Sequence, residues 1–260
     1  MTPVRIIARL DVKGPNVVKG IHLEGLRIVG SPGDLARRYY QQGIDEIIFM
    51  DIVASLYGRN NILSVVEMAA RDIFVPLTVG GGLRTIEDIA AALRAGADKV
   101  AINTAAVLRP ELIQEAARAF GSQCVVLSVE AKRTGPGEWE AFTDNGRQKT
   151  GLNALEWIEH GVSLGAGEIL ITSIDQEGTR RGFDIDLVRQ VVNRVPSPVI
   201  ACGGAGSVAD VVNLLRESGT DTVCCASIFH YVTTTVPALK AELARSGIPV
   251  RFTKSDQPVT

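Results

Sequence analysis

The chain has 260 residues, 46% of them hydrophobic, and a formal net charge of −2 at pH 7. This length allows one domain with a full core, and the near-neutral charge gives no reason to expect nucleic acid or an anionic membrane surface as a partner. No apolar run is long enough to cross a bilayer and the first residues lack the pattern of a signal peptide, so we expect a cytoplasmic protein.

Short β-branched runs alternate with amphipathic segments along the whole chain. The predicted strands are residues 4–10, 46–50, 75–79, 99–102, 124–129, 168–172, 198–201 and 222–225. The predicted helices lie near residues 32–42, 60–71, 85–95, 110–120, 153–164, 184–194, 207–218 and 235–245. This strict alternation predicts an α/β fold, a (β/α)8 TIM barrel over residues 1–250, followed by a polar tail over 251–260. An open doubly wound sheet is the alternative, but no dinucleotide-binding motif follows the first strand.

The second half of the chain repeats the first. The corresponding positions are Asp11 and Glu130, Asp51 and Asp175, Gly58 and Gly182, Gly80-Gly81 and Gly203-Gly204, and Asn103-Thr104 and Ala226-Ser227. The sequence separation between the two members of a pair is nearly constant, and differences in loop length account for its small variation. The pattern predicts a barrel built from two similar half-barrels.

Two glycine-rich turns stand at corresponding places in these halves, at residues 79–84 and 202–206. Thr85 and Ser207 follow them and can cap the next helices. Such a turn directs backbone N–H groups and a helix N-terminus to one point, which suits a phosphate. One turn alone would be explained more simply as a tight strand–helix connection, but two predict a substrate with a phosphate at each end.

Polar side chains at the predicted strand ends supplement these turns. Asn103 and Thr104 end the fourth strand, and Ala226 and Ser227 end the eighth. Asp51 and Asp175 end the second and sixth strands; Asp175 precedes a loop that could close over a ligand, whereas Asp51 could equally be scaffolding. Lys19, after the first strand, could bind a phosphate, support Asp11, or be a solvated loop lysine.

Two carboxylates lie on opposite sides of the predicted barrel mouth, because Asp11 ends the first strand and Glu130 ends the fifth. The chemistry of (β/α)8 barrels lies at the carboxyl ends of the strands. Two facing acids can act as general base and general acid when their surroundings separate their pKa values. Each could merely cap its loop, but a matched pair beside two phosphate turns favours catalysis.

Four charged residues begin otherwise apolar strands at the other end: Arg5, Glu46, Lys99 and Glu168. Charges at strand starts are usually solvated, but two bases and two acids could pair as a ring that closes the barrel floor. The three histidines have no metal-ligand spacing and the four cysteines lie in apolar runs, so we expect reduced thiols, no metal and no cofactor.

Over about residues 4–250 the chain resembles the cyclase subunit of imidazole glycerol phosphate synthase. The resemblance lies in the motifs at residues 10–13, 18–20, 77–84, 96–99, 102–106, 121–124, 150–152, 165–170 and 226–230. It implies a barrel of histidine biosynthesis that forms a heterodimer with a glutaminase. Ammonia from the glutaminase would pass through the floor and react with a bisphosphorylated ribulosyl-formimino aminoimidazole carboxamide ribonucleotide, giving imidazole glycerol phosphate and aminoimidazole carboxamide ribotide.

The resemblance also implies residue roles. Asp11 would be a catalytic acid or base, the ring of four charges would be the gate for ammonia, and Asp98 would face the partner. Gly82, Asn103 and Thr104 match one phosphate site, and Gly178, Gly204, Ala226 and Ser227 match the other.

Three positions depart from the family pattern. Glu130 and Glu177 stand where the family carries aspartates, and Arg9 stands where it commonly has a small cysteine. Strand alternation directs Arg9 into the barrel, one layer below Asp11. Because a buried guanidinium needs a partner, we predict that Arg9 pairs with Glu130, lowers the pKa of that acid and narrows the path of ammonia.

These departures leave other functions open. A paralogous synthase could aminate another phosphorylated or nucleotide-linked sugar, or a non-catalytic barrel could bind and activate the glutaminase. The isomerase relative of the family is disfavoured by residues 121–124 and by the ring of charges.

Overall fold

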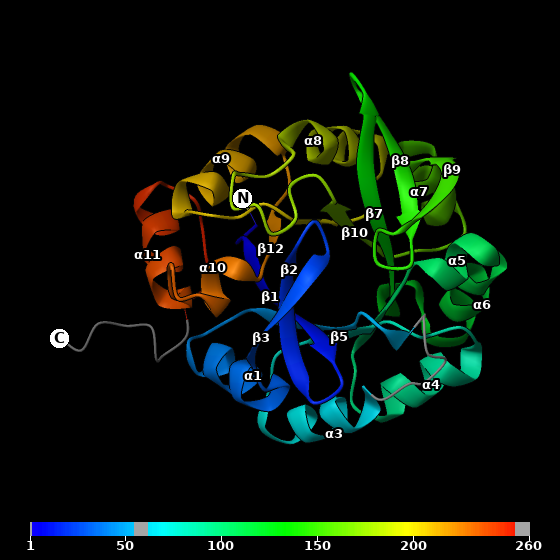
Figure 1. Cartoon of the computed structure of the whole chain (residues 1–260), viewed down its shortest axis with the longest axis horizontal. Helices are drawn as coiled ribbons and strands as arrows, with labels where there is room; N and C mark the ends of the chain where they lie inside the picture. The colour runs from blue at the N-terminus through cyan, green and yellow to red at the C-terminus, as the bar shows by residue number, and fades with distance from the viewer. Residues whose placement is uncertain (1, 55–61, 253–260) are drawn as a thin grey trace.

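The computed structural model describes residues 2–54 and 62–252, and Figure 1 shows a ring of helices around a central barrel of strands. Gly58, the first two residues of the predicted second helix, and residues 253–260 of the predicted tail lie outside the described residues. No helix in the described part of the chain is long and apolar enough to span a membrane.

Eight parallel strands close on themselves within the described residues, which confirms the (β/α)8 barrel. They are β1 (Arg5–Lys13), β4 (Glu46–Asp51), β5 (Leu77–Gly80), β6 (Lys99–Ile102), β7 (Val125–Gly135), β10 (Glu168–Ser173), β11 (Val199–Cys202) and β12 (Thr222–Cys225). The last strand pairs with the first, with Arg5 opposite Thr222 and Ile7 opposite Cys224. This closure rules out the open sheet, while an origin from two half-barrels stays a prediction.

The outer helices follow the predicted alternation and begin and end within three residues of their predicted bounds. They are α1 (Pro32–Gln41), α3 (Leu63–Asp72), α4 (Ile86–Arg94), α6 (Glu111–Phe120), α7 (Ala154–Ser163), α8 (Ile185–Arg194), α9 (Val208–Ser218) and α11 (Val236–Arg245). Thr85 and Asp88 form a capping box on α4, and Ser207 and Asp210 form one on α9, as predicted.

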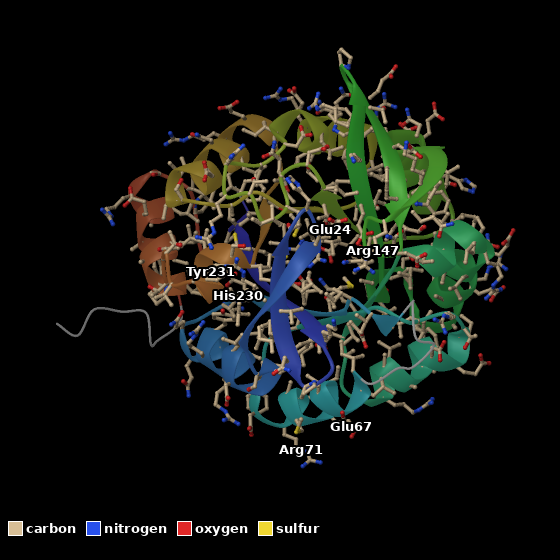
Figure 2. All side chains as sticks on the ribbon, viewed as in Figure 1. Glu24, Glu67, Arg71, Arg147, His230 and Tyr231 are labelled. Atoms are coloured by element: carbon tan, nitrogen blue, oxygen red, sulfur yellow. The ribbon has the colours of Figure 1, made fainter. Side chains whose placement is uncertain are left out.

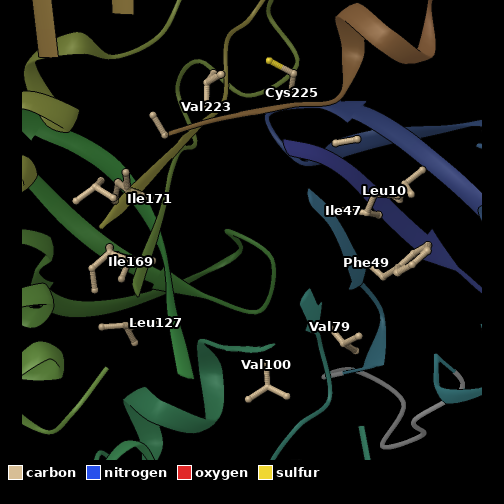
Figure 3. Packing of buried hydrophobic residues seen from close by; sticks show 14 of the residues in the cluster. Leu10, Ile47, Phe49, Val79, Val100, Leu127, Ile169, Ile171, Val223 and Cys225 are labelled. Carbon is tan, nitrogen blue, oxygen red and sulfur yellow. The ribbon is translucent and has the colours of Figure 1, made fainter. Parts of the chain in front are cut away.

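Side-chain alternation along the strands divides the core into two layers. On β1, Ile6, Ala8 and Leu10 face the helices, whereas Ile7 faces the barrel interior. Figure 3 shows the outer layer, in which Leu10, Phe49 and other apolar side chains of the strands pack together. The inner layer includes Ile48, Ala101, Val126, Leu170 and Ile200, so apolar side chains pack above the charged floor.

Two hairpins, which the sequence analysis did not predict, extend from the carboxyl ends of β1 and β7. The first consists of β2 (Asn16–Ile21) and β3 (Glu24–Gly30), and the second consists of β8 (Glu138–Thr143) and β9 (Gln148–Asn153). Figure 1 shows the β2–β3 hairpin crossing the open end of the barrel. Short helices α5 (Thr104–Leu108) and α10 (Ser227–His230) follow β6 and β12, and a single 3-10 turn, η1 (Ser122–Cys124), precedes β7.

Candidate active site

Asp11 on β1 and Glu130 on β7 lie at the carboxyl ends of opposite barrel strands, and both are buried. Lys19 of β2 and Arg9 of β1 surround Asp11. The Nε atom of Arg9 is 2.7 Å from Asp11 Oδ1, and Lys19 Nζ is 3.2 Å from Oδ2. Burial alone would raise the pKa of Asp11, but these two cations outweigh it and lower that pKa to about 2.

Lys19 is buried at the mouth, which excludes a solvated loop lysine. It also donates a hydrogen bond to Glu177, in the loop after β10. Burial opposes its charge, but Glu177 and Asp11 together raise the pKa of Lys19 above its usual range. Lys19 therefore remains charged and supports Asp11, one of the three roles that its sequence allowed.

Glu130 has neutral partners. Its Oε2 atom accepts hydrogen bonds from Asn103 Nδ2 at 3.1 Å and from the backbone N–H of Gly146 at 2.8 Å. Burial raises the pKa of Glu130 to about 7, although the charge of Arg9 and the Gly146 N–H act in the opposite direction. At neutral pH this carboxyl group can therefore both hold and release a proton.

The predicted pairing of Arg9 with Glu130 is wrong. Arg9 binds Asp11 instead, which lies two residues further along the same inward face of β1. Its Nη1 atom donates to Thr172 Oγ1 at 3.2 Å and to Cys202 Sγ at 3.7 Å, on β10 and β11. The pKa of Glu130 is accordingly raised, not lowered as we expected.

The turn between β8 and β9 positions Glu130, and this contact was not predicted from the sequence. Asp144, Asn145 and Gly146 all have positive φ angles, of 51°, 57° and 74°. The turn also donates the Asp144 N–H to Thr104 Oγ1 at 3.2 Å. An Asp-Asn-Gly sequence is a recognisable left-handed turn signal, because these three residue types tolerate positive φ.

A cavity of about 590 Å³ opens beside Glu130 at the mouth. Several predicted residues line it together: Asp51, Gly82, Asn103, Thr104 and Glu130. Ser128 and Lys149 add further polar groups. Asp51 accepts the Val53 N–H at 3.0 Å, and burial raises its pKa, so it also shapes its own loop.

The residues predicted for the second phosphate site gather at the ends of β10, β11 and β12. The Gly182 N–H donates to the Gly204 carbonyl at 2.9 Å, and Gly203 adjoins Ser173 and Glu177. Ala226 precedes α10, and Ser227 begins it. Gly178 touches the β2–β3 hairpin so closely that a Cβ atom there would lie 2.2 Å from the Gly20 carbonyl oxygen.

Asp175 is not among the residues that line the cavity beside Glu130. Its Oδ2 atom accepts the N–H of Arg133 at 2.8 Å, which ties the loop after β10 to β7. Its observed role is therefore to connect this loop to β7.

The tip of the β2–β3 hairpin is anchored over the mouth. Leu23 packs with Phe142 of β8 and Ile174 of the loop after β10. The N–H of His22 donates to the Glu177 carbonyl at 2.8 Å. The side-chain amide of Asn145, in the β8–β9 turn, donates to the Leu23 carbonyl at 3.5 Å. The two unpredicted hairpins thus meet above the two acids.

His230 is a further buried group near Asp11 and Lys19, and its sequence context gave no indication of this. Its Nδ1 atom is 2.7 Å from the hydroxyl of Tyr39. Burial, followed by the charge of Lys19, lowers the pKa of His230 to about 4, so the ring is neutral at pH 7. Among the described residues there is no cluster of three His, Cys, Asp or Glu side chains that could hold a metal ion, and all four cysteines are free.

At the floor, the four charged residues form the predicted ring. Arg5 binds Glu46 at 2.7 Å and Glu168 at 2.5 Å, and Lys99 binds the same two glutamates at 3.0 and 2.8 Å. Exposed Asp98 is next to Lys99, and its Oδ2 atom accepts the Leu77 N–H at 2.8 Å. The floor is thus closed by ion pairs that link four strands.

The fold and the opposed acids define a (β/α)8 barrel enzyme, and residues 5–235 match the family model described as histidine biosynthesis protein. The chain is 60% identical over 210 residues to imidazole glycerol phosphate synthase subunit HisF of Legionella pneumophila; this alignment covers 81% of the chain and 99% of the relative. The chain therefore belongs to the HisF family, the cyclase subunit of imidazole glycerol phosphate synthase, and is a lyase of histidine biosynthesis.

Proposed function

We propose that Asp11 and Glu130 are the catalytic pair of this cyclase, acting on ammonia and the bisphosphorylated ribonucleotide. The observation that carries the proposal is that two acids at the same end of the barrel have pKa values shifted in opposite directions. The pKa of Asp11 is held at about 2, so it is an anion that stabilises positive charge on the incoming nitrogen. The pKa of Glu130 is about 7, so it exchanges protons with the reacting groups.

The substrate's phosphates would lie at the two glycine turns. Gly82, Asn103 and Thr104 on the cavity wall suit one phosphate, with Asn103 also contacting Glu130. Gly178, Gly203, Gly204, Ala226 and Ser227 suit the other, across the mouth. Backbone N–H groups at turns and at starts of helices favour anions, which supports this assignment. The ribonucleotide would then stretch between the two acids.

The partner would be a glutaminase subunit docked on the floor. Its ammonia would pass the ring of Arg5, Glu46, Lys99 and Glu168 and move through the barrel. Asp98 and Phe74 lie at this end, and the Phe74 side chain is 76% exposed, an unusual setting for an aromatic ring. An aromatic side chain beside charged groups suits a protein interface.

The test is ammonia-dependent turnover of the ribonucleotide by the purified barrel, with an ammonium salt in place of the glutaminase. We expect Asp11→Asn and Glu130→Gln each to lower kcat at least about a hundredfold. Addition of the glutaminase should make glutamine a nitrogen source. Full activity in either variant would remove that acid from the mechanism.

A further inference from the structure

We propose that Arg9 is a positioning residue that makes Asp11 a fixed counter-charge and leaves Glu130 as the group that exchanges protons. The inference rests on the catalytic pair proposed above and deepens it, because it divides the work between the two acids.

Arg9 is held from three strands. Its side chain is 1% exposed and extends from β1 past β12 to Cys202 of β11 and Thr172 of β10. The third contact, to Asp11 Oδ1 at 2.7 Å, is a charge-assisted hydrogen bond. Because Thr172 and Cys202 hold its Nη1 atom, the guanidinium cannot turn away from Asp11 without losing buried hydrogen bonds.

Four buried charges balance one another around Asp11. Arg9 binds one oxygen of Asp11, Lys19 binds the other, and Lys19 also binds Glu177. Two cations and two anions, all buried, therefore share one site. A proton placed on Asp11 would leave two buried cations facing one anion, which is strongly unfavourable. The network keeps Asp11 ionised throughout the reaction.

Other titratable groups face this network from the remaining elements. They are Glu130 on β7, Cys202 on β11, Cys224 on β12 and His230 on α10, while Asp144 of the β8–β9 turn faces Glu130. Burial keeps His230 neutral and raises the pKa of the Cys224 thiol. The two hydrogen bonds to Glu130 come from neutral donors, so a proton on Glu130 breaks no ion pair.

The side chain of Arg9 is 1% exposed, and its hydrogen bonds go to Asp11, Thr172 and Cys202 inside the barrel. Its replacement should therefore change the proton chemistry more than substrate binding. The pKa of Asp11 is about 2 in wild type, so its protonation lies below the pH range of the activity assay. We expect this pKa to rise by about one to three pH units in Arg9→Met, which adds an acid limb with a midpoint between about pH 3 and pH 5 to the kcat profile. The KM for the ribonucleotide should stay within about twofold of wild type.

The experiment measures ammonia-dependent kcat and KM from pH 3 to 9 for wild type, Arg9→Met and Arg9→Lys. Arg9→Lys restores a cation and should move this acid limb back below the measured range. Arg37→Met is the matched control, because Arg37 is an exposed arginine that pairs with exposed Asp72 at 2.9 Å. A uniform loss of kcat in Arg9→Met, with no change in the shape of the profile, would show a merely structural role and overturn the proposal.

A second measurement does not depend on turnover. The carboxyl carbon of Asp11 can be followed by 13C NMR during a pH titration of the same proteins, assigned with Asp11→Asn. The Asp11 resonance should titrate at higher pH in Arg9→Met than in wild type or Arg9→Lys. An unchanged titration overturns the inference even if the enzyme is active. Conversely, a shifted titration with full activity in Asp11→Asn refutes the catalytic pair and leaves the electrostatic role of Arg9 standing.

Discussion

At the scale of single residues, the kind of neighbour decides the ionisation of the two acids more than burial does. Asp11 and Glu130 are both buried, yet their pKa values move in opposite directions. Asp11 is bound by two cations, whereas the hydrogen-bond donors to Glu130 are an amide and a backbone N–H. The extra methylene of Glu130, compared with an aspartate, does not explain the difference in pKa, because the difference follows from the hydrogen-bonding partners of the two acids.

Sequence could predict the location of these residues but not their partners. Alternation along β1 indicates that Arg9 and Asp11 share the inward face, and both do. The predicted partner was wrong because alternation gives the face of a side chain and not its rotamer. Asp11 is available along the same strand, whereas Glu130 is on the opposite strand and is already bound by the β8–β9 turn.

The raised pKa of Glu130 makes stability depend on pH. Above about pH 7 the folded protein contains a buried Glu130 anion, while in the unfolded chain the same group ionises near its usual 4.5. Stability is therefore lost as pH rises from about 4.5 through about 7. Glu130→Gln removes this penalty, so we expect it to be more stable than wild type at pH 8 by up to about 3 kcal/mol, with little difference at pH 4.5.

Urea unfolding of Glu130→Gln and wild type at the two pH values measures this difference. Glu67→Gln is the control, because Glu67 is exposed on α3 at the outer edge of the molecule (Figure 2). An equal effect of Glu130→Gln at pH 4.5 and pH 8 would contradict the assigned ionisation.

At the scale of elements, the hairpins over the mouth are held by a small apolar cluster separate from the main core. Leu23, Phe142 and Ile174 form this cluster and join the two hairpins to the loop after β10. Because the cluster is local, weakening it should open the hairpin without unfolding the barrel. The mouth and the barrel therefore have different stabilities.

We expect Leu23→Ala to lower the free energy of hairpin opening by about 2 kcal/mol, which raises the rate of cleavage in the open state about thirtyfold. Limited trypsin digestion measures this rate at exposed Arg27 of β3. Ile28→Ala is the matched control, because Ile28 lies on the same hairpin and is 67% exposed. Equal cleavage rates in the two variants would mean that the cluster does not anchor the hairpin.

The barrel elements were predictable and the hairpins were not, for one physical reason. Barrel strands such as β4 and β11 are buried on both faces and appear as continuous apolar runs. The outer hairpin strands β3 and β9 are largely exposed, so their sequences carry no comparable signal. The first hairpin supplies Lys19, which binds Asp11, and the turn of the second supplies the Gly146 N–H that binds Glu130. The elements that were hardest to predict therefore complete the site.

At the scale of the whole molecule, the two ends of the barrel have separate tasks. The mouth carries the opposed acids, and the floor carries the ring of charges with exposed Phe74, which contacts Tyr40 edge-on at 6.2 Å between ring centroids. The glutaminase that we propose on the floor would therefore deliver ammonia without occupying the mouth. This separation makes the proposed interface testable independently of the chemistry.

Phe74→Ala should weaken binding of the glutaminase at least about tenfold, because truncating an exposed aromatic anchor removes contact area at the interface. Ammonia-dependent turnover should be unchanged, since Phe74 lies at the end opposite the acids. Calorimetric titration of the two subunits measures the affinity, and Ile28→Ala, at the mouth, serves as control. Unchanged affinity in Phe74→Ala would place the interface elsewhere.

Closure of the barrel between its first and last strands has a consequence for synthesis on the ribosome. β1 is synthesised more than 200 residues before its partner β12. Until then one edge of β1 has no β12 to pair with, and until Glu168 is synthesised Arg5 and Lys99 have only Glu46 as a partner. The nascent chain thus carries an open sheet edge for most of translation, a state that attracts chaperones and favours association with other unfinished chains.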